Sequence, residues 1–300
     1  MMKKLLLCLC ACMLCLAPAL PVSAEEAEIK YDAWNTFVHS FQTSDGSTAE
    51  MQYMLYIPAA YETDPHLPLI TYIPDATYAG SSLNLYKRAA CSANWATKDK
   101  SAEAPAVLLT IRLSEVGSDV RDPATEPGQI VPLIDSVVAR LGLDEDRLYL
   151  TGQSMGGILD FALNTAWPDK FAATVYVGCQ PGSEVGDEMY NALLAEAAFA
   201  DQKFIYITSR LDMKAPYGQD AVEQVLIERG IAYGKGYGLD HKAEDLNATV
   251  QAVLDQGYPQ NFLGFTQLTS TGEGAAEHMQ SFKYAYAIDA LYTWLLAQSR

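Results

Sequence analysis

The feature that most constrains this chain is a short turn between a predicted strand and a predicted helix. Residues 147–153 are typical of a buried strand, and apolar side chains recur at helical spacing over 155–167. The sequence GQSMG at 152–156 spans the junction between them. A serine at such a junction is held in a strained backbone conformation around which only glycines fit. We therefore predict that the Ser154 hydroxyl is exposed at the tip of a sheet.

This position predicts a nucleophilic serine. The N-terminal amides of the following helix point to where an oxyanion would form. A serine hydroxyl is a poor nucleophile at neutral pH, so a histidine must take its proton and an acid must orient that histidine. In folds with this turn the acid and then the histidine follow the serine in the chain. That order excludes His39 and His66 and leaves His241 and His278.

The two remaining histidines differ in setting. His241 opens a polar stretch ahead of a helix predicted at 243–256, where an exposed residue is expected. His278 follows the last predicted strand and the loop at 269–276, and it precedes the helix that we expect at 280–298. The order and setting favour His278 as the base.

The acid is predicted from the same order. Asp212 comes just after a strand predicted at 203–209, and ligand chemistry collects at the carboxyl ends of strands in α/β sheets. Asp212 is therefore the favoured acid. Asp187 and Asp240 remain alternatives.

An oxyanion needs two backbone amides. The residue after the nucleophile, Met155, supplies one, and the loop at 73–80 must supply the other. Pro74 has no N–H, which leaves its successors in that loop. We predict Ala76 as the second donor.

Short apolar runs alternate with helical patterns through most of the chain. This alternation predicts an α/β fold with a mostly parallel central sheet and helices on both faces. Runs at 29–41 and 51–57, joined by a turn-rich segment, predict antiparallel N-terminal strands. The other predicted strands are 67–73, 106–113, 147–153, 172–179, 203–209 and 261–268, and the predicted helices are 82–95, 129–141, 155–167, 188–199, 219–229, 243–256 and 280–298. The Gly-rich stretches 181–186 and 234–238 are interpreted as loops, and 217–260 as either a lid over the pocket or outer helices.

The N-terminus has the pattern of an export signal. Lys3 and Lys4 precede an apolar run that ends in Val-Ser-Ala at 22–24. We predict a signal peptide at 1–24, a single domain at 25–300, and a secreted or cell-surface protein. A lipoprotein is the alternative, because four cysteines lie in this segment, but none follows the pattern that lipid attachment needs. Cys91 and Cys179 remain in the mature chain, and their pairing stays open.

The charge of the mature chain limits its partners. Without the two leader lysines, 18 basic residues face 37 acidic ones, which gives a formal charge of −19. Nucleic acid is therefore excluded as a partner. The acidic residues are spread along the chain, which indicates a solvated surface more than a cation-binding patch. We expect no stable membrane insertion, and the oligomeric state stays open.

Several segments together resemble the secreted esterases of the α/β-hydrolase superfamily. They are 67–76, 146–157, 167–173, Asp212 with Pro216 four residues later, and His278 ahead of an aromatic final helix. The pattern is most similar to polyhydroxybutyrate depolymerases, feruloyl esterases and related carbohydrate esterases, with prolyl-oligopeptidase-type peptidases as neighbours. The resemblance implies an α/β-hydrolase fold, no metal or other cofactor, and a two-step acyl-enzyme reaction. In it Ser154 matches the nucleophile, Asp212 the acid, His278 the base, and Met155 with Ala76 the oxyanion donors.

Two positions depart from that family. Many members have His-Gly where this chain has Pro74 and Asp75, and the change would place a carboxylate near the mouth of the site. Glu277 stands beside His278 where a glycine is frequent.

The expected substrate is a small-molecule or polymer-linked ester, with a feruloyl, acetyl or hydroxyalkanoyl group. Aromatic side chains near the predicted loops could stack on a sugar or phenolic acid, although core packing is their commoner use. These are Tyr72, Tyr78, Tyr86, Trp95, Tyr217, Tyr233 and Tyr237. A serine peptidase, an acyltransferase and a non-catalytic binding protein remain alternatives, because one fold hosts many functions.

Overall fold

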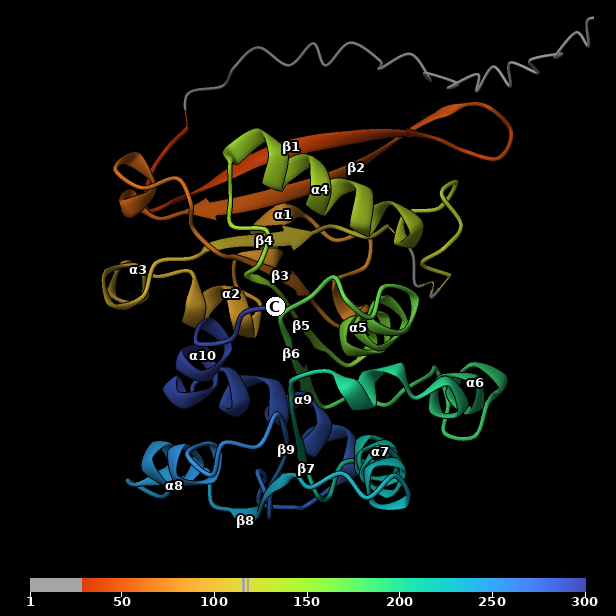
Figure 1. Ribbon diagram of the computed structural model, residues 1–300, viewed down its shortest axis with the longest axis vertical. Helices are drawn as coiled ribbons and strands as arrows, with labels where there is room; N and C mark the ends of the chain where they lie inside the picture. The colour runs from red at the N-terminus through yellow and green to blue at the C-terminus, as the bar shows by residue number, and fades with distance from the viewer. Residues whose placement is uncertain (1–28, 115–116, 118) are drawn as a thin grey trace, which may run out of the picture.

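A computed structural model describes residues 29–114, 117 and 119–300 of the chain. The signal peptide predicted at 1–24 lies outside the described residues. The described chain forms a sheet in the strand order β1-β2-β4-β3-β5-β6-β7-β9-β8 (Figure 1). Helices cover both of its faces.

The sheet opens with an antiparallel pair. Strand β1 (Ala33–Gln42) runs against β2 (Thr48–Ile57), and β2 runs antiparallel to β4 (Val107–Ile111). All later neighbours are parallel. The predicted fold class, a mostly parallel sheet with antiparallel N-terminal strands, is confirmed.

The central strands are buried along their whole length. They are β3 (Leu69–Ile73), β4, β5 (Leu148–Gln153), β6 (Ala173–Val177), β7 (Phe204–Ser209) and β9 (Gln260–Phe265). Helices shield both faces, so most residues of these strands are apolar and the strands show no regular polar alternation. That pattern is why their positions could be predicted to within a few residues.

The helices divide between the two faces of the sheet (Figure 1). One face carries α2 (Ala90–Trp95), α8 (Leu246–Leu254), α9 (Gly274–Tyr286) and α10 (Asp289–Leu296), and the other carries α4 (Ile130–Leu141), α5 (Met155–Ala166), α6 (Glu188–Glu196) and α7 (Ala215–Glu228). Two short helices, α1 (Leu83–Tyr86) and α3 (Lys98–Glu103), flank α2. No helix in the described ranges is long and apolar enough to cross a bilayer.

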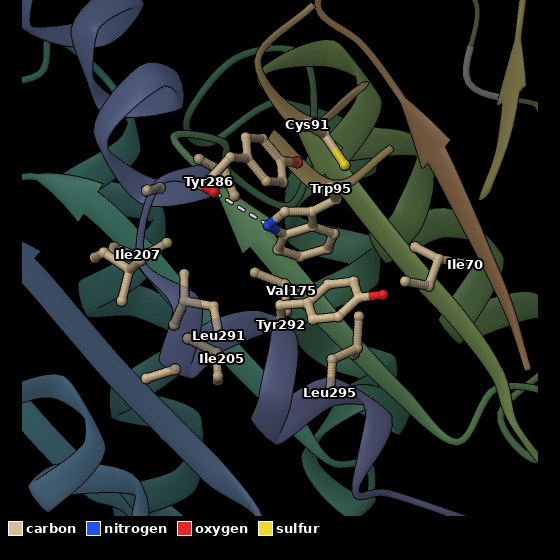
Figure 2. Packing of buried hydrophobic residues seen from close by; sticks show 14 of the residues in the cluster. Ile70, Cys91, Trp95, Val175, Ile205, Ile207, Tyr286, Leu291, Tyr292 and Leu295 are labelled. Atoms are coloured by element: carbon tan, nitrogen blue, oxygen red, sulfur yellow. Dashed lines mark hydrogen bonds between the residues drawn. The ribbon is translucent and has the colours of Figure 1, made fainter. Parts of the chain in front are cut away.

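Trp95 anchors the C-terminal helices to the rest of the core. Its indole N–H donates to the Tyr286 carbonyl oxygen at 3.1 Å, as Figure 2 shows. Its ring meets those of Tyr286 and Tyr292 edge-on, with centroids 5.1 and 5.4 Å away. Edge-to-face pairs of this kind add to the stability from buried area. Helix α9 is thereby fixed against α2.

Strand β8 (Gly234–Leu239) corrects the loop predicted at 234–238. It pairs in parallel with β9 at the edge of the sheet. A Cβ on Gly234 would lie 2.1 Å from the Asn261 side chain, and one on Gly236 would lie 2.9 Å from Val253. The glycines let β8 lie this close to Asn261 and Val253, although a glycine-rich stretch is typical of a loop. Residues 217–260 thus form this edge strand together with α8 and most of α7, so they are outer helices, and none of them lines the pocket beside Ser154.

Two predicted helices are each broken in the structure. The one at 82–95 is split into α1 and α2, and the one at 280–298 is split into α9 and α10 around Ile288, which has extended backbone angles. The Asn247 side chain accepts the Ala290 amide at 2.8 Å and so caps α10 from another helix. This partner is distant in sequence, which is why the break was missed.

Candidate active site

Ser154 lies at the sharp turn predicted between β5 and α5. Its backbone has φ 51° and ψ −117°, which is a strained conformation for a residue with a side chain. Hydrogen bonds hold the turn, because the Ser154 amide donates to the Val177 carbonyl at 3.0 Å and the Ser154 carbonyl accepts the Ile158 amide at 3.1 Å.

The glycines of the turn are required by close packing. A Cβ on Gly156 would lie 1.8 Å from the Ile73 carbonyl oxygen, and one on Gly152 would lie 2.3 Å from the Gly156 backbone. No side chain fits in either place. Helix α5 therefore starts directly against the end of β3.

Ser154, His278 and Asp212 form a continuous hydrogen-bonded chain. The His278 Nε2 lies 2.9 Å from the Ser154 Oγ, and its Nδ1 lies 2.6 Å from the Asp212 Oδ2. A carboxylate can only accept, so Nδ1 carries the proton and Nε2 is free to accept from the serine hydroxyl. The structure thus brings together the three residues predicted for nucleophile, base and acid.

The acid is held in place by its own loop. The Asp212 side chain is fully buried, and its Oδ1 accepts the backbone amides of Lys214 at 3.0 Å and Ala215 at 3.3 Å. One carboxylate oxygen is therefore fixed by the start of α7, which leaves the other to face His278.

His278 lies inside α9, whereas it was predicted to precede a helix at 280–298. Its imidazole is 21% exposed, so the ring is largely shielded from solvent, and it lines the same pocket as Ser154. The helix begins four residues earlier, at Gly274. Because α9 packs on the sheet, the ring is carried by a rigid element.

The alternative residues lie outside this arrangement. Asp187 caps α6 by accepting the Tyr190 amide at 2.6 Å. Asp240 is 67% exposed, 3.9 Å from His241. The prediction that His241 is exposed is wrong, because its side chain is only 6% exposed and packs on Tyr284 with ring centroids 4.3 Å apart.

Met155 and Ala76 both face the pocket at the start of a helical turn. Met155 is the first residue of α5, and Ala76 is the first of η2 (Ala76–Tyr78). Neither backbone N–H donates to an acceptor within the described part of the chain. Both amides are therefore available to an oxyanion.

Asp75 does not stand at the mouth of the site as the sequence suggested. Its side chain is buried, with Oδ2 accepting from the Gln153 Nε2 at 2.5 Å and Oδ1 from the Thr77 amide at 2.9 Å. Tyr72 in turn donates to the Gln153 Oε1 at 2.9 Å. These hydrogen bonds hold the Asp75 carboxylate in the interior of the protein.

A pocket of about 350 Å³ opens beside Ser154. It is lined by Ala76, Gly117, Ser154, Met155, Ile158, Gln180, Ser183, Asp212, Met213, Lys214 and His278. None of the Tyr and Trp residues considered for stacking is among them; Tyr72, Tyr86 and Trp95 belong to the buried core. In the residues that the structure describes, no group of three His, Cys, Asp or Glu side chains is placed to hold a metal ion.

Two buried carboxyl groups near the site were not assigned a role by sequence. Glu277, next to His278, is fully buried and accepts several hydrogen bonds. Asp160 interrupts the apolar side of α5, and its carboxyl oxygens have no partner among the described residues. The burial of Asp160 could have been predicted from the sequence, because it is an acidic residue inside an apolar helical pattern. Cys91 and Cys179 are free and buried.

The strand order and the Ser154 turn are features of the α/β-hydrolase fold, and comparison with solved structures agrees. No protein family matches the chain by sequence, and no curated protein does. A thermostable esterase superimposes with TM-score 0.61 at 17% identity, over 88% of this chain and 63% of its own. A ferulic acid esterase gives TM-score 0.56 at 11% identity, over 89% and 97%. An S-formylglutathione hydrolase from Agrobacterium tumefaciens gives 0.53 at 13%, over 87% and 94%.

These likenesses establish the fold. The chain has the α/β-hydrolase fold, and it spans 63% of the length of the thermostable esterase and nearly all of the other two structures. At such identities the fold is what the comparison shows, so the activity has to be argued from the site.

Proposed function

We propose that the protein is an exported serine hydrolase that cleaves carboxylic esters. The observation that carries the proposal is the hydrogen-bonded chain from the Ser154 Oγ through His278 to the buried Asp212, at 2.9 and 2.6 Å. Three similar folds belong to proteins described as a thermostable esterase, a ferulic acid esterase and an S-formylglutathione hydrolase, which supports acyl transfer to water. Export rests on the leader pattern at 1–24.

In the first step the Ser154 Oγ attacks the ester carbonyl carbon. Its proton passes to the His278 Nε2, and the Asp212 carboxylate stabilises the imidazolium through Nδ1–H. The negative charge develops on the carbonyl oxygen, where the Met155 and Ala76 amides would donate to it. His278 then protonates the leaving alcohol, and an acyl-enzyme remains on Ser154.

In the second step water replaces the alcohol. His278 takes a proton from the water, whose oxygen attacks the acyl carbon, and the same two amides hold the oxyanion. The acid product leaves as the proton returns to the Ser154 Oγ. No cofactor is needed for either step.

We infer a short aliphatic acyl group from the mixture of apolar and polar side chains that line the pocket. Met155, Ile158 and Met213 supply apolar contact close to Ser154, and Gln180 and Ser183 supply polar contact. We propose acetyl or short hydroxyalkanoyl esters of a polymer or small alcohol as substrates, ahead of feruloyl esters. A pocket of this kind orients its ligand by a few polar groups among apolar ones.

The test is turnover of acetyl, butyryl, hydroxybutyryl and feruloyl esters by wild type and by Ser154→Ala. We expect the variant to lose about 10⁴-fold or more in kcat, because the nucleophile is gone. Ser299→Ala, an exposed change near the C-terminus, is the control. Unchanged activity in Ser154→Ala would refute the assignment.

Adding a peptide chromogen and an acceptor alcohol to this panel separates the alternatives. Faster cleavage of a peptide chromogen than of any ester would identify a peptidase. Acyl transfer to an added alcohol in preference to water would identify an acyltransferase.

A further inference from the structure

Glu277 is buried in α9 directly before His278. Its side chain has no exposure to solvent, although glutamate is rarely buried without a charged partner. The family resemblance gives no role to an acid here, because glycine is frequent at this position.

The Glu277 carboxylate accepts hydrogen bonds from two loops. Its Oε2 accepts from the Ser209 hydroxyl at 2.5 Å, and its Oε1 accepts from the Thr269 amide and hydroxyl, both at 2.7 Å. The Leu268 amide lies 3.0 and 2.9 Å from the two oxygens. All of these donors are uncharged.

These contacts keep the carboxylate ionised. Burial raises the pKa of Glu277, but the hydrogen bonds from Ser209, Thr269 and Leu268 outweigh it and hold the pKa below its ordinary value. A charge buried with this many aligned donors fixes the position of every group that donates to it.

One of the two loops carries the acid. Ser209 is the last residue of β7, and its carbonyl accepts the Asp212 amide at 3.2 Å. Its hydroxyl oxygen also accepts the Leu211 amide at 3.3 Å. Through Ser209, Glu277 is linked to the turn that ends in Asp212.

The other loop leads into the helix that carries the base. Thr269 follows β9, and its hydroxyl oxygen accepts the Gly272 amide at 3.0 Å, just before α9 begins. Glu277 itself lies on α9, one residue before His278. The carboxylate therefore ties the base-bearing helix to the acid-bearing turn.

We propose that Glu277 is a positioning residue that sets the distance between Asp212 and His278. The proposal rests on the proposed function of these residues as acid and base. Glu277 does not touch Ser154 or the reacting atoms in this arrangement. It acts through Ser209 and Thr269. Without its charge, the turn that carries Asp212 and helix α9 lose the acceptor that both are bonded to.

The test is Glu277→Gln, which keeps the shape of the side chain and removes the charge. An amide can accept on one side only, so several of the donors lose their partner. A small misplacement of catalytic groups costs roughly 100-fold in rate, so we expect kcat to fall by about 10- to 100-fold with KM changed by less than about 3-fold. The low-field proton resonance of the His278 Nδ1–H should weaken or vanish.

Glu273→Gln is the matched control, because it removes an equal charge from an exposed position at the start of the same helix. It should leave both kcat and the proton resonance unchanged. A Glu277→Gln protein with wild-type kcat and an intact resonance would overturn the proposal. Lost activity with an unchanged resonance would overturn it too, since the acid–base contact would then be in place.

Two further measurements keep the test decisive. If Glu277→Gln fails to fold, Ser209→Ala removes one of the same hydrogen bonds, and an unchanged kcat and resonance there would refute the proposal. The resonance is measured without substrate, so it reports on Glu277 even if wild type hydrolyses no ester. Failure of the proposed function would appear as an inactive wild type, and failure of this proposal as an unaltered resonance.

Discussion

Two buried carboxyl groups lie on the two helices that carry the candidate site, and their surroundings are opposite. Asp160 lies on α5, six residues after Ser154, and Glu277 lies on α9 beside His278. Both side chains are wholly buried. Glu277 is surrounded by hydrogen-bond donors, whereas neither oxygen of Asp160 has a partner in the described part of the chain.

The difference shows that hydrogen bonding, more than burial, decides whether a carboxyl group is charged. Burial raises the pKa of Asp160 well above its ordinary value, and nothing opposes it. Burial acts on Glu277 as well, but its donors hold the pKa below the ordinary value. We therefore expect Asp160 to be neutral within the core and Glu277 to be charged at the site.

The two groups also give opposite dependences of stability on pH. The lowered folded pKa of Glu277 stabilises the protein above the unfolded value of 4.5, and this contribution is lost as the pH falls through the folded pKa. The raised folded pKa of Asp160 makes the unfolded state release a proton that the folded state keeps. Its contribution to stability is therefore lost as the pH rises above 3.8.

The largest effect on stability is expected from Glu277→Leu. The change leaves Ser209, Leu268 and Thr269 with buried donors that have no acceptor. We expect the free energy of unfolding at pH 7 to fall by about 3–5 kcal/mol, measured by urea denaturation.

Glu273→Leu is the control for that variant, since it makes the same substitution at an exposed position of the same helix. It should change the free energy of unfolding by less than about 0.5 kcal/mol. If the two variants are equally stable, Glu277 does not differ from a surface residue and the contrast with Asp160 is lost.

A smaller effect of opposite sign is expected from Asp160→Asn. The amide has the shape of the protonated carboxyl group but cannot ionise in the unfolded state. We expect the variant to be more stable than wild type at pH 7 by about 1–3 kcal/mol, because only wild type loses stability when its unfolded state releases the Asp160 proton. The gain should shrink as the pH falls towards 3.8, because the carboxyl group then becomes protonated in the unfolded state as well.

The control is Asp245→Asn, at an exposed position before α8 where the side chain makes no capping hydrogen bond. Its stability relative to wild type should vary little between pH 4 and pH 7. A constant difference for Asp160→Asn over that range would show that Asp160 is charged in the folded protein.

The parts of the molecule that the sequence predicted are those determined locally or by chain order. The turn around Ser154 follows from adjacent glycines between a strand and a helix, and the buried strands follow from their apolar runs. Asp212 and His278 could be predicted because the fold fixes their order after the serine. The distances between them could not, since they join residues 66 and 124 positions apart.

The parts that sequence missed depend on contacts between distant segments. Strand β8 was not predicted, because the glycines that leave room for Asn261 and Val253 are typical of a loop. The burial of His241 depends on Tyr284, and the inward turn of Asp75 depends on Gln153. Glu277 was visible as an unusual neighbour of His278, but its partners lie at the end of β7 and after β9, far from it in sequence.

The central claim is that His278 and Asp212 activate Ser154. Labelling with a fluorophosphonate, followed by peptide mass spectrometry, tests it most directly because the probe reacts only with an activated serine and needs no knowledge of the substrate. Wild type should be modified at Ser154, and His278→Ala should react at least about 10³-fold more slowly, because the base is missing. A folded wild type that stays unlabelled, or a His278→Ala variant labelled at the wild-type rate, would contradict the claim.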